Sequence, residues 1–245
     1  MMIASRNGFM VGKRLTAKSY PSMPDLCHLD GIENVGYGTH SDTPSAWVDL
    51  TGHGCNVSSF VSSSSVSSDC FISAGDGIGN ISSAKSAPIR SSWANGEWTE
   101  EIVFKAETGT AAFFGQGAAA YIDRNGVFFQ IQSYNLNIAI IPNYTTLNFW
   151  AGLVPAKTRM SLAVTASFTN NLIAVYLNGS LKTSRSVEVP KPALSTAVYL
   201  GTINYTPGYS SLTGEFCELR SHSRALTASE IAANYAVDKA RFGLP

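Results

Sequence analysis

The sequence predicts an all-β chain, an antiparallel sandwich of two sheets with one short helix at its C-terminus. Three observations lead to this prediction. Apolar and polar residues alternate with a period of two through most of the chain after Leu29, which is the spacing of half-buried strands. Asn-Gly pairs, the strongest short signal for a β-hairpin, stand between such stretches at Asn125 and Asn178. One capped amphipathic pattern closes the chain, as a helix would on the face of a sheet.

The expected strands follow one another through the middle of the chain. Six stretches carry the pattern: residues 98–105, 111–115, 120–123, 127–131, 171–177 and 180–182. The Asn-Gly pairs join the third stretch to the fourth and the fifth to the sixth, so two hairpins are predicted. The Ser-rich run 58–68 fits either a loop or an edge strand with a polar outer face.

The helix is predicted from its capping signals. Thr227 and Glu230 form a Thr-x-x-Glu capping box, in which each side chain accepts a hydrogen bond from the other residue's backbone N–H. Ile231 and Tyr235 are four residues apart and give the helix an apolar stripe, and Gly243 can end it. A short amphipathic helix is therefore expected to cover one face of the sandwich.

The composition excludes several classes of protein. The 245 residues include 17 basic and 17 acidic ones, and only 14% are charged, against roughly 25% in a typical globular domain. This balance lacks the positive field with which nucleic-acid-binding proteins collect phosphates, so we expect no nucleic-acid partner. No apolar run approaches a membrane span, and the first residues lack the apolar stretch of a secretory signal. We therefore expect neither membrane insertion nor classical secretion.

The N-terminal segment differs from the rest of the chain in charge. Its basic residues are Arg6, Lys13, Arg14 and Lys18, and no acidic residue occurs before Asp25. We predict that residues 1–25 form a basic arm and that residues 26–245 form the folded domain. Two interpretations of the arm remain open: it docks onto a partner or a neighbouring subunit, or it is a frayed terminus.

The cysteines give no metal or disulfide signature. There are four of them: Cys27, Cys55, Cys70 and Cys217. Disulfide frameworks are typical of much smaller secreted domains, so we predict free thiols or ordinary core residues. Cys27-His28 and His53-Gly54-Cys55 could supply two Cys and two His ligands, but their spacing fits no standard zinc motif. We expect no metal at these residues.

Six segments carry motifs of one known family. They are Asp-Gly-Ile-Glu-Asn at 30–34, Trp-Val-Asp-Leu-Thr-Gly-His-Gly-Cys-Asn at 47–56, Thr-Glu-Glu-Ile-Val-Phe-Lys at 99–105, Val-Tyr-Leu-Asn-Gly at 175–179, Tyr-Leu-Gly at 199–201 and the closing segment 218–231. In this order they resemble the laminin-G-like domains of the concanavalin A-like lectin/glucanase superfamily. The resemblance covers nearly all of residues 29–243 and implies a concanavalin A-like jelly roll.

One segment departs from that family. Laminin-G-like domains usually carry Phe-x-Gly-x-x-Asp-Tyr after the Gly-x-Gly turn, whereas residues 71–81 read Phe-Ile-Ser-Ala-Gly-Asp-Gly-Ile-Gly-Asn-Ile. The resemblance therefore does not support binding of a ligand or of calcium by residues 71–81. Asp30, Asp49 and Asp76 also lack the dense acidic loop of a calcium site. We expect no cofactor, with calcium as the alternative.

Many members of the superfamily are glucanases with the motif Glu-x-Asp-x-Glu on one strand. Alternation places these side chains on one face, where the outer two act as nucleophile and acid/base. Glu97 and Glu101 have the spacing of the outer two. Thr99 replaces the central Asp, however, and has no carboxylate that could set the pKa values of the two glutamates apart. We expect no catalytic residue, with a glucanase that uses Glu97 and Glu101 as one alternative.

Glycan binding needs aromatic rings beside amides and hydroxyls. Two expected loops have that chemistry, and their candidate residues are Tyr134, Asn143, Tyr144, Asn204, Tyr205 and Tyr209. The competing interpretation is that these tyrosines only cover strand ends.

Two motifs, Asp-Gly-Ile-x-Asn at 30–34 and Asn-Tyr-x-x-Asp-Lys-x-Arg-Phe-Gly at 234–243, also resemble versions found in gut bacteria and in the virion proteins of their phages. This resemblance implies a non-catalytic module on a virion, in a capsid decoration, head fibre or tail, that displays an adhesive or glycan-binding surface. Its partners would be other virion proteins or further copies of the chain, reached through the arm, and bacterial or mucus glycans. The other alternative is an extracellular or cell-surface carbohydrate-binding protein of a gut bacterium.

Overall fold

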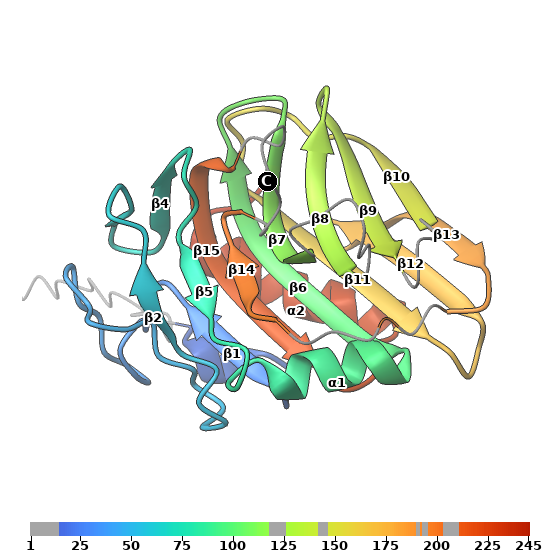
Figure 1. Cartoon of the computed structure of the whole chain (residues 1–245), viewed down its shortest axis with the longest axis horizontal. Helices are drawn as coiled ribbons and strands as arrows, with labels where there is room; N and C mark the ends of the chain where they lie inside the picture. Colours follow the sequence, from blue (N-terminus) through green and yellow to red (C-terminus); the bar gives the residue numbers. More distant parts are fainter. Residues whose placement is uncertain (1–14, 118–125, 142–146, 190–191, 193–195, 203–210) are drawn as a thin grey trace, which may run out of the picture.

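The chain folds into two antiparallel sheets, which confirms the predicted sandwich (Figure 1). The computed structural model describes residues 15–117, 126–141, 147–189, 192, 196–202 and 211–245. The eight-stranded sheet contains β1 (Cys27–Asp30), β3 (Ser65–Val66), β4 (Phe71–Ala74), β6 (Glu97–Ala106), β11 (Met160–Ser167), β12 (Leu172–Leu177), β13 (Ser180–Ser186) and β15 (Thr213–His222). The seven-stranded sheet contains β2 (Val57–Phe60), β5 (Gly79–Ile81), β7 (Ala111–Gly117), β8 (Gly126–Gln132), β9 (Asn135–Ile141), β10 (Leu147–Leu153) and β14 (Val198–Leu200).

The strand order brings distant parts of the chain together. In the eight-stranded sheet it is β13-β12-β11-β6-β15-β4-β3, with β1 paired to β15 beside this path. In the seven-stranded sheet it is β10-β9-β8-β7-β14-β5-β2. Leu219 of β15 lies opposite both Ile102 of β6 and Leu29 of β1. The first and last strands of the domain therefore meet at the centre of one sheet, as the implied jelly roll requires.

Aromatic rings fill the space between the sheets. Phe104 of β6 stacks on Phe113 of β7, with ring centroids 4.5 Å apart. Trp93 packs edge-on against both Trp98 and Phe114. All five side chains are fully buried, and burying each large apolar side chain is worth roughly 1.5–3 kcal/mol.

The hairpin predictions are confirmed where the structure describes them. Asn178 and Gly179 have φ values of 49° and 70° and connect β12 to β13, as a two-residue type I′ turn requires. Strands β7 and β8 pair antiparallel on either side of residues 118–125, so the expected turn at Asn125 and the expected strand 120–123 lie outside the described residues. The Ser-rich run forms β2 and β3, the last strands in the two sheet orders, so the edge-strand interpretation holds.

The sequence pattern missed one helix, α1 (Ala87–Asn95), which lies at one end of the sandwich (Figure 1). Pro88 is in its first turn, where a backbone N–H would have no acceptor within the helix, so the missing N–H of proline costs nothing. Gly96 closes it with φ of 76°, and the Gly96 N–H donates to the carbonyls of Ser92 and Trp93. The sequence pattern missed this helix because Pro88 and the Asn95-Gly96 pair are also typical of turns between strands.

The C-terminal helix, α2 (Ala228–Phe242), is confirmed with its caps. Thr227 and Glu230 form the reciprocal capping box, and Gly243 ends the helix in the left-handed region. The helix lies on the outer face of the eight-stranded sheet (Figure 1). Its buried side chains include Ile231 but also the polar Asn234 and Asp238, so the helix docks through a polar site as well as an apolar stripe.

The prediction of four free thiols is wrong, because Cys70 and Cys217 form a disulfide. Phe71 of β4 pairs with Phe216 of β15, Cys70 directly precedes β4, and Cys217 follows Phe216 on β15. Their separation of 147 residues hides this neighbourhood from any local pattern. Cys27 and Cys55 are free and fully buried, as expected of core residues.

The described part of the predicted arm lies against the domain. Ala17 and Tyr20 are buried, while Lys18 is exposed and places its Nζ 4.3 Å from the centre of the Tyr37 ring. Residues 1–14, with Arg6, Lys13 and Arg14, lie outside the described residues, so a separate role for the arm stays a prediction. No helix in the described ranges is long and apolar enough to span a membrane.

Candidate functional site

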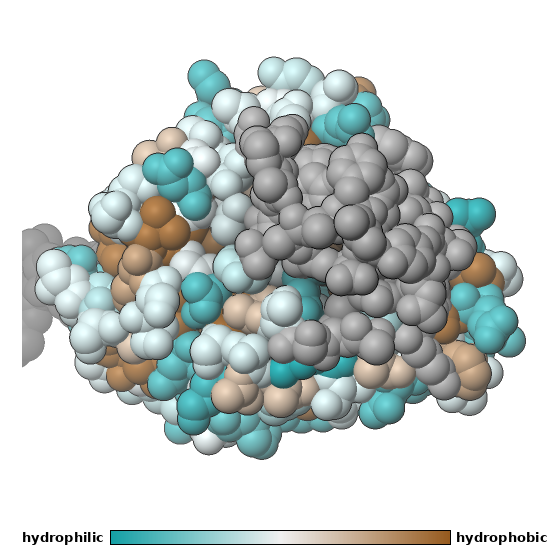
Figure 2. Space-filling model, in the orientation of Figure 1, coloured by the Kyte–Doolittle hydropathy of each residue, from teal (hydrophilic) through white to brown (hydrophobic). Residues whose placement is uncertain are grey.

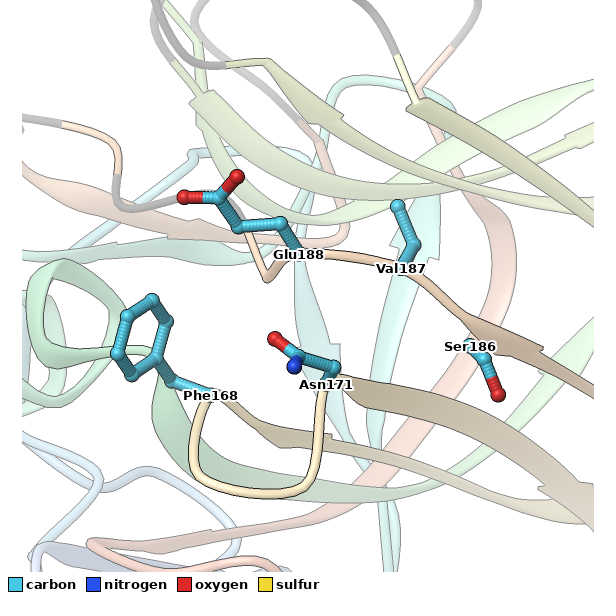
Figure 3. A pocket seen from close by; sticks show the side chains of 5 residues that line it. All are labelled: Phe168, Asn171, Ser186, Val187 and Glu188. Carbon is cyan, nitrogen blue, oxygen red and sulfur yellow. The ribbon is translucent and has the colours of Figure 1, made fainter.

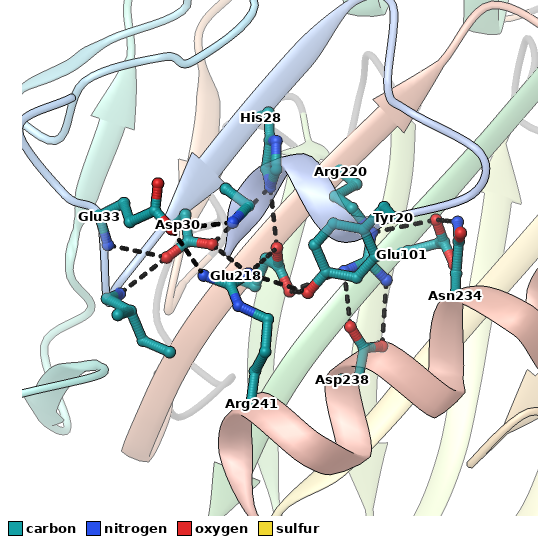
Figure 4. Close-up of polar contacts among 12 residues, drawn as sticks. Tyr20, His28, Asp30, Glu33, Glu101, Glu218, Arg220, Asn234, Asp238 and Arg241 are labelled. Carbon is teal, nitrogen blue, oxygen red and sulfur yellow. Dashed lines mark hydrogen bonds and ion pairs between the residues drawn. The ribbon is translucent and has the colours of Figure 1, made fainter. Parts of the chain in front are cut away.

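A buried polar network joins α2, the eight-stranded sheet and residues 20–33 (Figure 4). Arg220 of β15 is at its centre and donates to Glu218 at 2.7 Å, to Asp238 at 2.6 and 3.0 Å and to Glu101 at 3.1 Å. The Tyr20 ring lies 3.9 Å from the Arg220 guanidinium carbon. The network looks like an active site because it concentrates charge, but Arg220 and its three carboxylate partners are at most 1% exposed.

The pKa values in the network follow from burial and pairing. Burial alone would raise the pKa of Glu101, but Arg220 and His222 outweigh it and lower that pKa to about 2. Burial lowers the pKa of His28 to about 4, so this imidazole is neutral at pH 7. The neutral His28 and the charged Glu101 are each hydrogen-bonded, whereas His28 Nδ1 and Arg241 Nε are buried with no hydrogen-bond partner among the described residues. Because the side chains of the network are buried, a substrate has no access to it.

The network does not fit a metal ion. His28, Asp30 and Glu218 lie close enough to share one. Glu218, however, already accepts hydrogen bonds from the Tyr20 hydroxyl at 2.6 Å and from Arg220, and the Arg241 Nη1 lies 2.5 Å from the Asp30 carboxylate. A cation would have to displace these guanidinium groups, because two like charges repel in a buried site.

The other aspartates considered for calcium are also engaged. The Asp49 carboxylate accepts backbone N–H groups from His28, Thr51 and Cys55. Asp76 accepts from the Ser63 hydroxyl at 2.9 Å. These contacts explain the aspartates as loop anchors, and calcium binding stays a prediction.

The structure separates the two glutamates of the glucanase alternative. Glu101 is 1% exposed and hydrogen-bonded to Arg220, His222 and the α2 residue Asn234. Glu97 is the first residue of β6, half-buried, and accepts from the Thr169 N–H at 2.7 Å. Since α2 covers Glu101, a sugar chain cannot reach both carboxylates together.

A third glutamate, Glu100, points to the other side of β6, into the core. The Trp93 indole N–H and the Ser221 hydroxyl donate to its two carboxylate oxygens. Burial outweighs these hydrogen bonds and raises the pKa of Glu100 to about 8. The carboxyl group is therefore mostly protonated at pH 7. The sequence pattern of β6 did not predict a buried, protonated glutamate at this position.

Titration of Glu100 contributes a loss of stability between about pH 5 and pH 8, opposed up to about pH 6.5 by His28, which takes up its proton more readily in the unfolded chain. The native state keeps the Glu100 proton up to about pH 8, whereas the unfolded chain releases it near its ordinary pKa of 4.5. The native state thus binds more protons in this window, and the free energy of unfolding falls by up to about 1.4 kcal/mol per pH unit. Glu100→Gln removes this titration, so the free energy of unfolding of the variant should rise relative to that of wild type at each step in urea unfolding at pH 5, 6, 7 and 8.

The control for this experiment is Glu107→Gln, which changes a carboxyl group at the surface next to Lys105. It should keep the wild-type slope. Equal slopes for wild type and Glu100→Gln would contradict the assignment.

An open pocket lies beside the turn from β11 to β12 and the end of β13 (Figure 3). Its volume is about 470 Å³ and it is lined by Phe168, Asn171, Ser186, Val187 and Glu188. The Phe168 ring, the Asn171 amide and the Glu188 carboxylate border one space, while the Ser186 hydroxyl points away from it (Figure 3). An apolar ring facing an amide and a carboxylate is the combination that holds a sugar by stacking and hydrogen bonds.

Hydrogen bonds fix this pocket to the sandwich. The Phe168 N–H donates to the carbonyl of Gly96, and the Val187 N–H donates at 2.8 Å to the carbonyl of Asn171. Glu97 accepts the Thr169 N–H and so ties the turn that carries Phe168 to the start of β6. The structure thus gives Glu97 a positioning contact instead of the catalytic one considered from sequence.

Of the predicted glycan residues, Tyr134 is the one in the described part of the chain, and it does not line this pocket. Tyr134 occupies the two-residue turn between β8 and β9 at φ of 63° and is 48% exposed. The remaining candidates lie outside the described residues: Asn143, Tyr144, Asn204, Tyr205 and Tyr209. Sequence reasoning missed Phe168, Asn171 and Glu188. The available signal was an aromatic residue in the short Ser-Phe-Thr-Asn-Asn connection that ends at Asn171.

Comparison with protein families identifies the fold from sequence. The model of the concanavalin A-like lectin/glucanase superfamily, in its laminin-G form, matches residues 82–232. The chain belongs to this superfamily. Its matched part includes α1, most of both sheets and the pocket residues Phe168 to Glu188. Among curated protein sequences, none matches this concanavalin A-like domain significantly.

Solved structures share the concanavalin A-like fold at low identity. A carbohydrate-binding module of the Ruminococcus gnavus intramolecular trans-sialidase, bound to α2,6-sialyllactose, is 12% identical with a TM-score of 0.57, over 68% of this chain and 96% of that one. The receptor-binding domain of botulinum neurotoxin type G is 13% identical with a TM-score of 0.63, over 89% and 52%. The Trypanosoma rangeli sialidase in complex with sialic acid is 13% identical with a TM-score of 0.61, over 87% and 33%. At these low identities, the similarities show a shared fold and not a shared function.

Proposed function

We propose that this chain is a non-catalytic carbohydrate-binding module that holds a neutral sugar in the pocket of Phe168, Asn171 and Glu188. The observation that carries the proposal is the shared space between the Phe168 ring and the two polar side chains (Figure 3). The ring is 38% exposed, so a sugar can stack on it, and the amide and carboxylate can hydrogen-bond the sugar's hydroxyls. Similar folds in carbohydrate-binding modules support the same conclusion.

The charge of the pocket selects the class of sugar. Glu188 is the one charged side chain among the five lining residues. The Glu188 carboxylate repels the carboxylate of a sialic acid, and because Glu188 is exposed, solvent screening limits this repulsion to a modest preference. We therefore assign neutral glycans to the pocket, in contrast to the sialyllactose bound by the Ruminococcus gnavus module.

Phe168→Ala is expected to weaken binding of a neutral oligosaccharide about tenfold, because the stacking face is lost and such a face is worth ~1.4 kcal/mol. A glycan array of neutral and sialylated sugars identifies the ligand, and calorimetry then measures the dissociation constants. The backbone of the turn stays anchored at Gly96 and Glu97 in this variant, so the domain keeps its fold.

Tyr37→Ala is the matched control, since Tyr37 is 39% exposed against 38% for Phe168. It should bind the neutral ligand like wild type. The proposal fails if the array shows no neutral ligand, if only sialylated sugars bind, or if Phe168→Ala binds as tightly as the control.

We further propose that the module is displayed on a phage particle, as its motifs led us to expect. The resemblance of residues 30–34 and 234–243 to virion proteins supports this setting, and so does the basic character of residues 1–24. Phage structural genes beside the coding gene would support it. A neighbourhood of bacterial surface-protein genes would favour the cell-surface alternative.

A further inference from the structure

A second groove lies at the edge of the sandwich opposite the proposed glycan pocket. It measures about 430 Å³ and is lined by Asp42, Thr43, Pro44, Phe60, Val61, Ser62, Ser64, Ser65, Val66 and Phe71. Strand β3 ends the order of the eight-stranded sheet, whereas β13, beside the first pocket, begins it. Hydrophobic residues gather at this end of the molecule, near β4, among hydrophilic ones (Figure 2).

Stacked rings form the wall of this groove. Phe60 is half-buried and stacks on Phe71, with centroids 5.3 Å apart and planes 14° apart. Phe71 stacks in turn on Trp47 at 4.1 Å and 19°. The Trp47 indole N–H donates to the carbonyl of Asp30 at 3.0 Å, which fixes the position of the three stacked rings. The Phe60 ring is therefore held in place before any ligand arrives, and binding there costs little side-chain entropy.

Hydroxyl groups form the rim. The side chains of Thr43, Ser62 and Ser65 are exposed, and within the described residues no hydrogen bond engages their hydroxyl groups. Each can both donate and accept. Asp42 is the one charged side chain in the lining, so the groove carries no cation for an acidic ligand. Unengaged hydroxyls around an aromatic ring suit a neutral, polyhydroxylated ligand.

We propose that this groove is a second saccharide site, in which a neutral sugar ring packs on Phe60 and hydrogen-bonds the hydroxyls of Thr43, Ser62 and Ser65. The inference extends the proposed function, but it depends on different residues at the opposite sheet edge. Two such sites make the domain bivalent, so that one molecule bridges two glycan chains or two points on one polymer. Joining two weak sites in this way raises avidity without new contacts.

The test places variants of the second groove in a Phe168→Ala background. Phe60→Leu keeps apolar contact with Phe71 but removes the planar ring, and Ser62→Ala/Ser65→Ala changes only exposed hydroxyls. The probes are laminarihexaose, cellohexaose and N-acetyllactosamine oligomers, with calorimetric stoichiometry and amide NMR shifts as readouts. We expect two sugars per wild-type chain and, in Phe168→Ala, one sugar bound at the wild-type affinity of the second groove while binding in the first pocket is about tenfold weaker. The remaining affinity should fall about tenfold in Phe60→Leu and several-fold in the serine variant.

The outcomes separate the two proposals. Loss of all binding in Phe168→Ala alone, or no effect of either groove variant in that background, overturns the second site and leaves the first. Shifts confined to residues 42–44 and 60–66 overturn the first pocket and keep the second site. If none of the probes shifts residues 42–44 and 60–66, or if wild type self-associates through this edge and Phe60→Leu abolishes the association, the groove is not a saccharide site.

Discussion

Arg220→Met is expected to cost about 3–5 kcal/mol of unfolding free energy, because it leaves buried carboxylates without their cation. Arg220 donates to Glu101, Glu218 and Asp238 and is fully buried. Methionine preserves much of the side-chain volume, so the loss reports on charge instead of on a cavity. For a domain of this size the melting temperature should fall by roughly 10 °C, measured by circular dichroism and by urea unfolding.

Arg224→Met provides the matched comparison. Arg224 pairs with Glu230 at 2.6 Å, but its side chain is 54% exposed. Solvent screens such a pair, so the variant should lose less than about 1 kcal/mol. Similar losses for the two arginine variants would show that burial of the network around Arg220 is not what stabilises α2.

Removing the Cys70–Cys217 disulfide is expected to cost about 5 kcal/mol, since it closes a loop of 147 residues and restricts the unfolded chain. Cys70→Ala/Cys217→Ala should unfold at a lower urea concentration than oxidised wild type. A reductant should lower the midpoint of wild type and leave the double variant unchanged.

Counting thiols gives an independent check on the disulfide. The unfolded, unreduced wild-type chain should expose two thiols, those of Cys27 and Cys55. Four reactive thiols, or a reductant-insensitive midpoint in wild type, would contradict the bridge.

The sequence signals that succeeded are those that depend on neighbours in the chain. The Thr227 capping box and the Asn178-Gly179 turn work through backbone groups within a few residues, so their geometry can be deduced locally. Helix α1 failed the same local test, because Pro88 and Gly96 start and end a short helix as readily as they form turns. Its helical state is decided by the burial of Ile89 and Trp93.

The candidate sites depended on tertiary neighbours and were largely hidden. Glu97 and Glu101 have the spacing of a catalytic pair, but docking of α2 buries one of them, and the sequence does not show which face the helix covers. Phe168 and Glu188 come together only because β12 and β13 return as a hairpin. Cys70 and Cys217 likewise meet through the pairing of β4 with β15.

The central position of β15 has a consequence for synthesis of the chain. This strand pairs with β1, β4 and β6, and it comes from the last part of the sequence. Tyr20, near the start, bonds to Glu218 and Arg241. While the ribosome is still making the protein, strands β1, β4 and β6 therefore lack their shared neighbour, and the N-terminal segment lacks its binding surface. The eight-stranded sheet can close only after β15 has left the ribosome, and until then its apolar strands depend on chaperones for protection from aggregation.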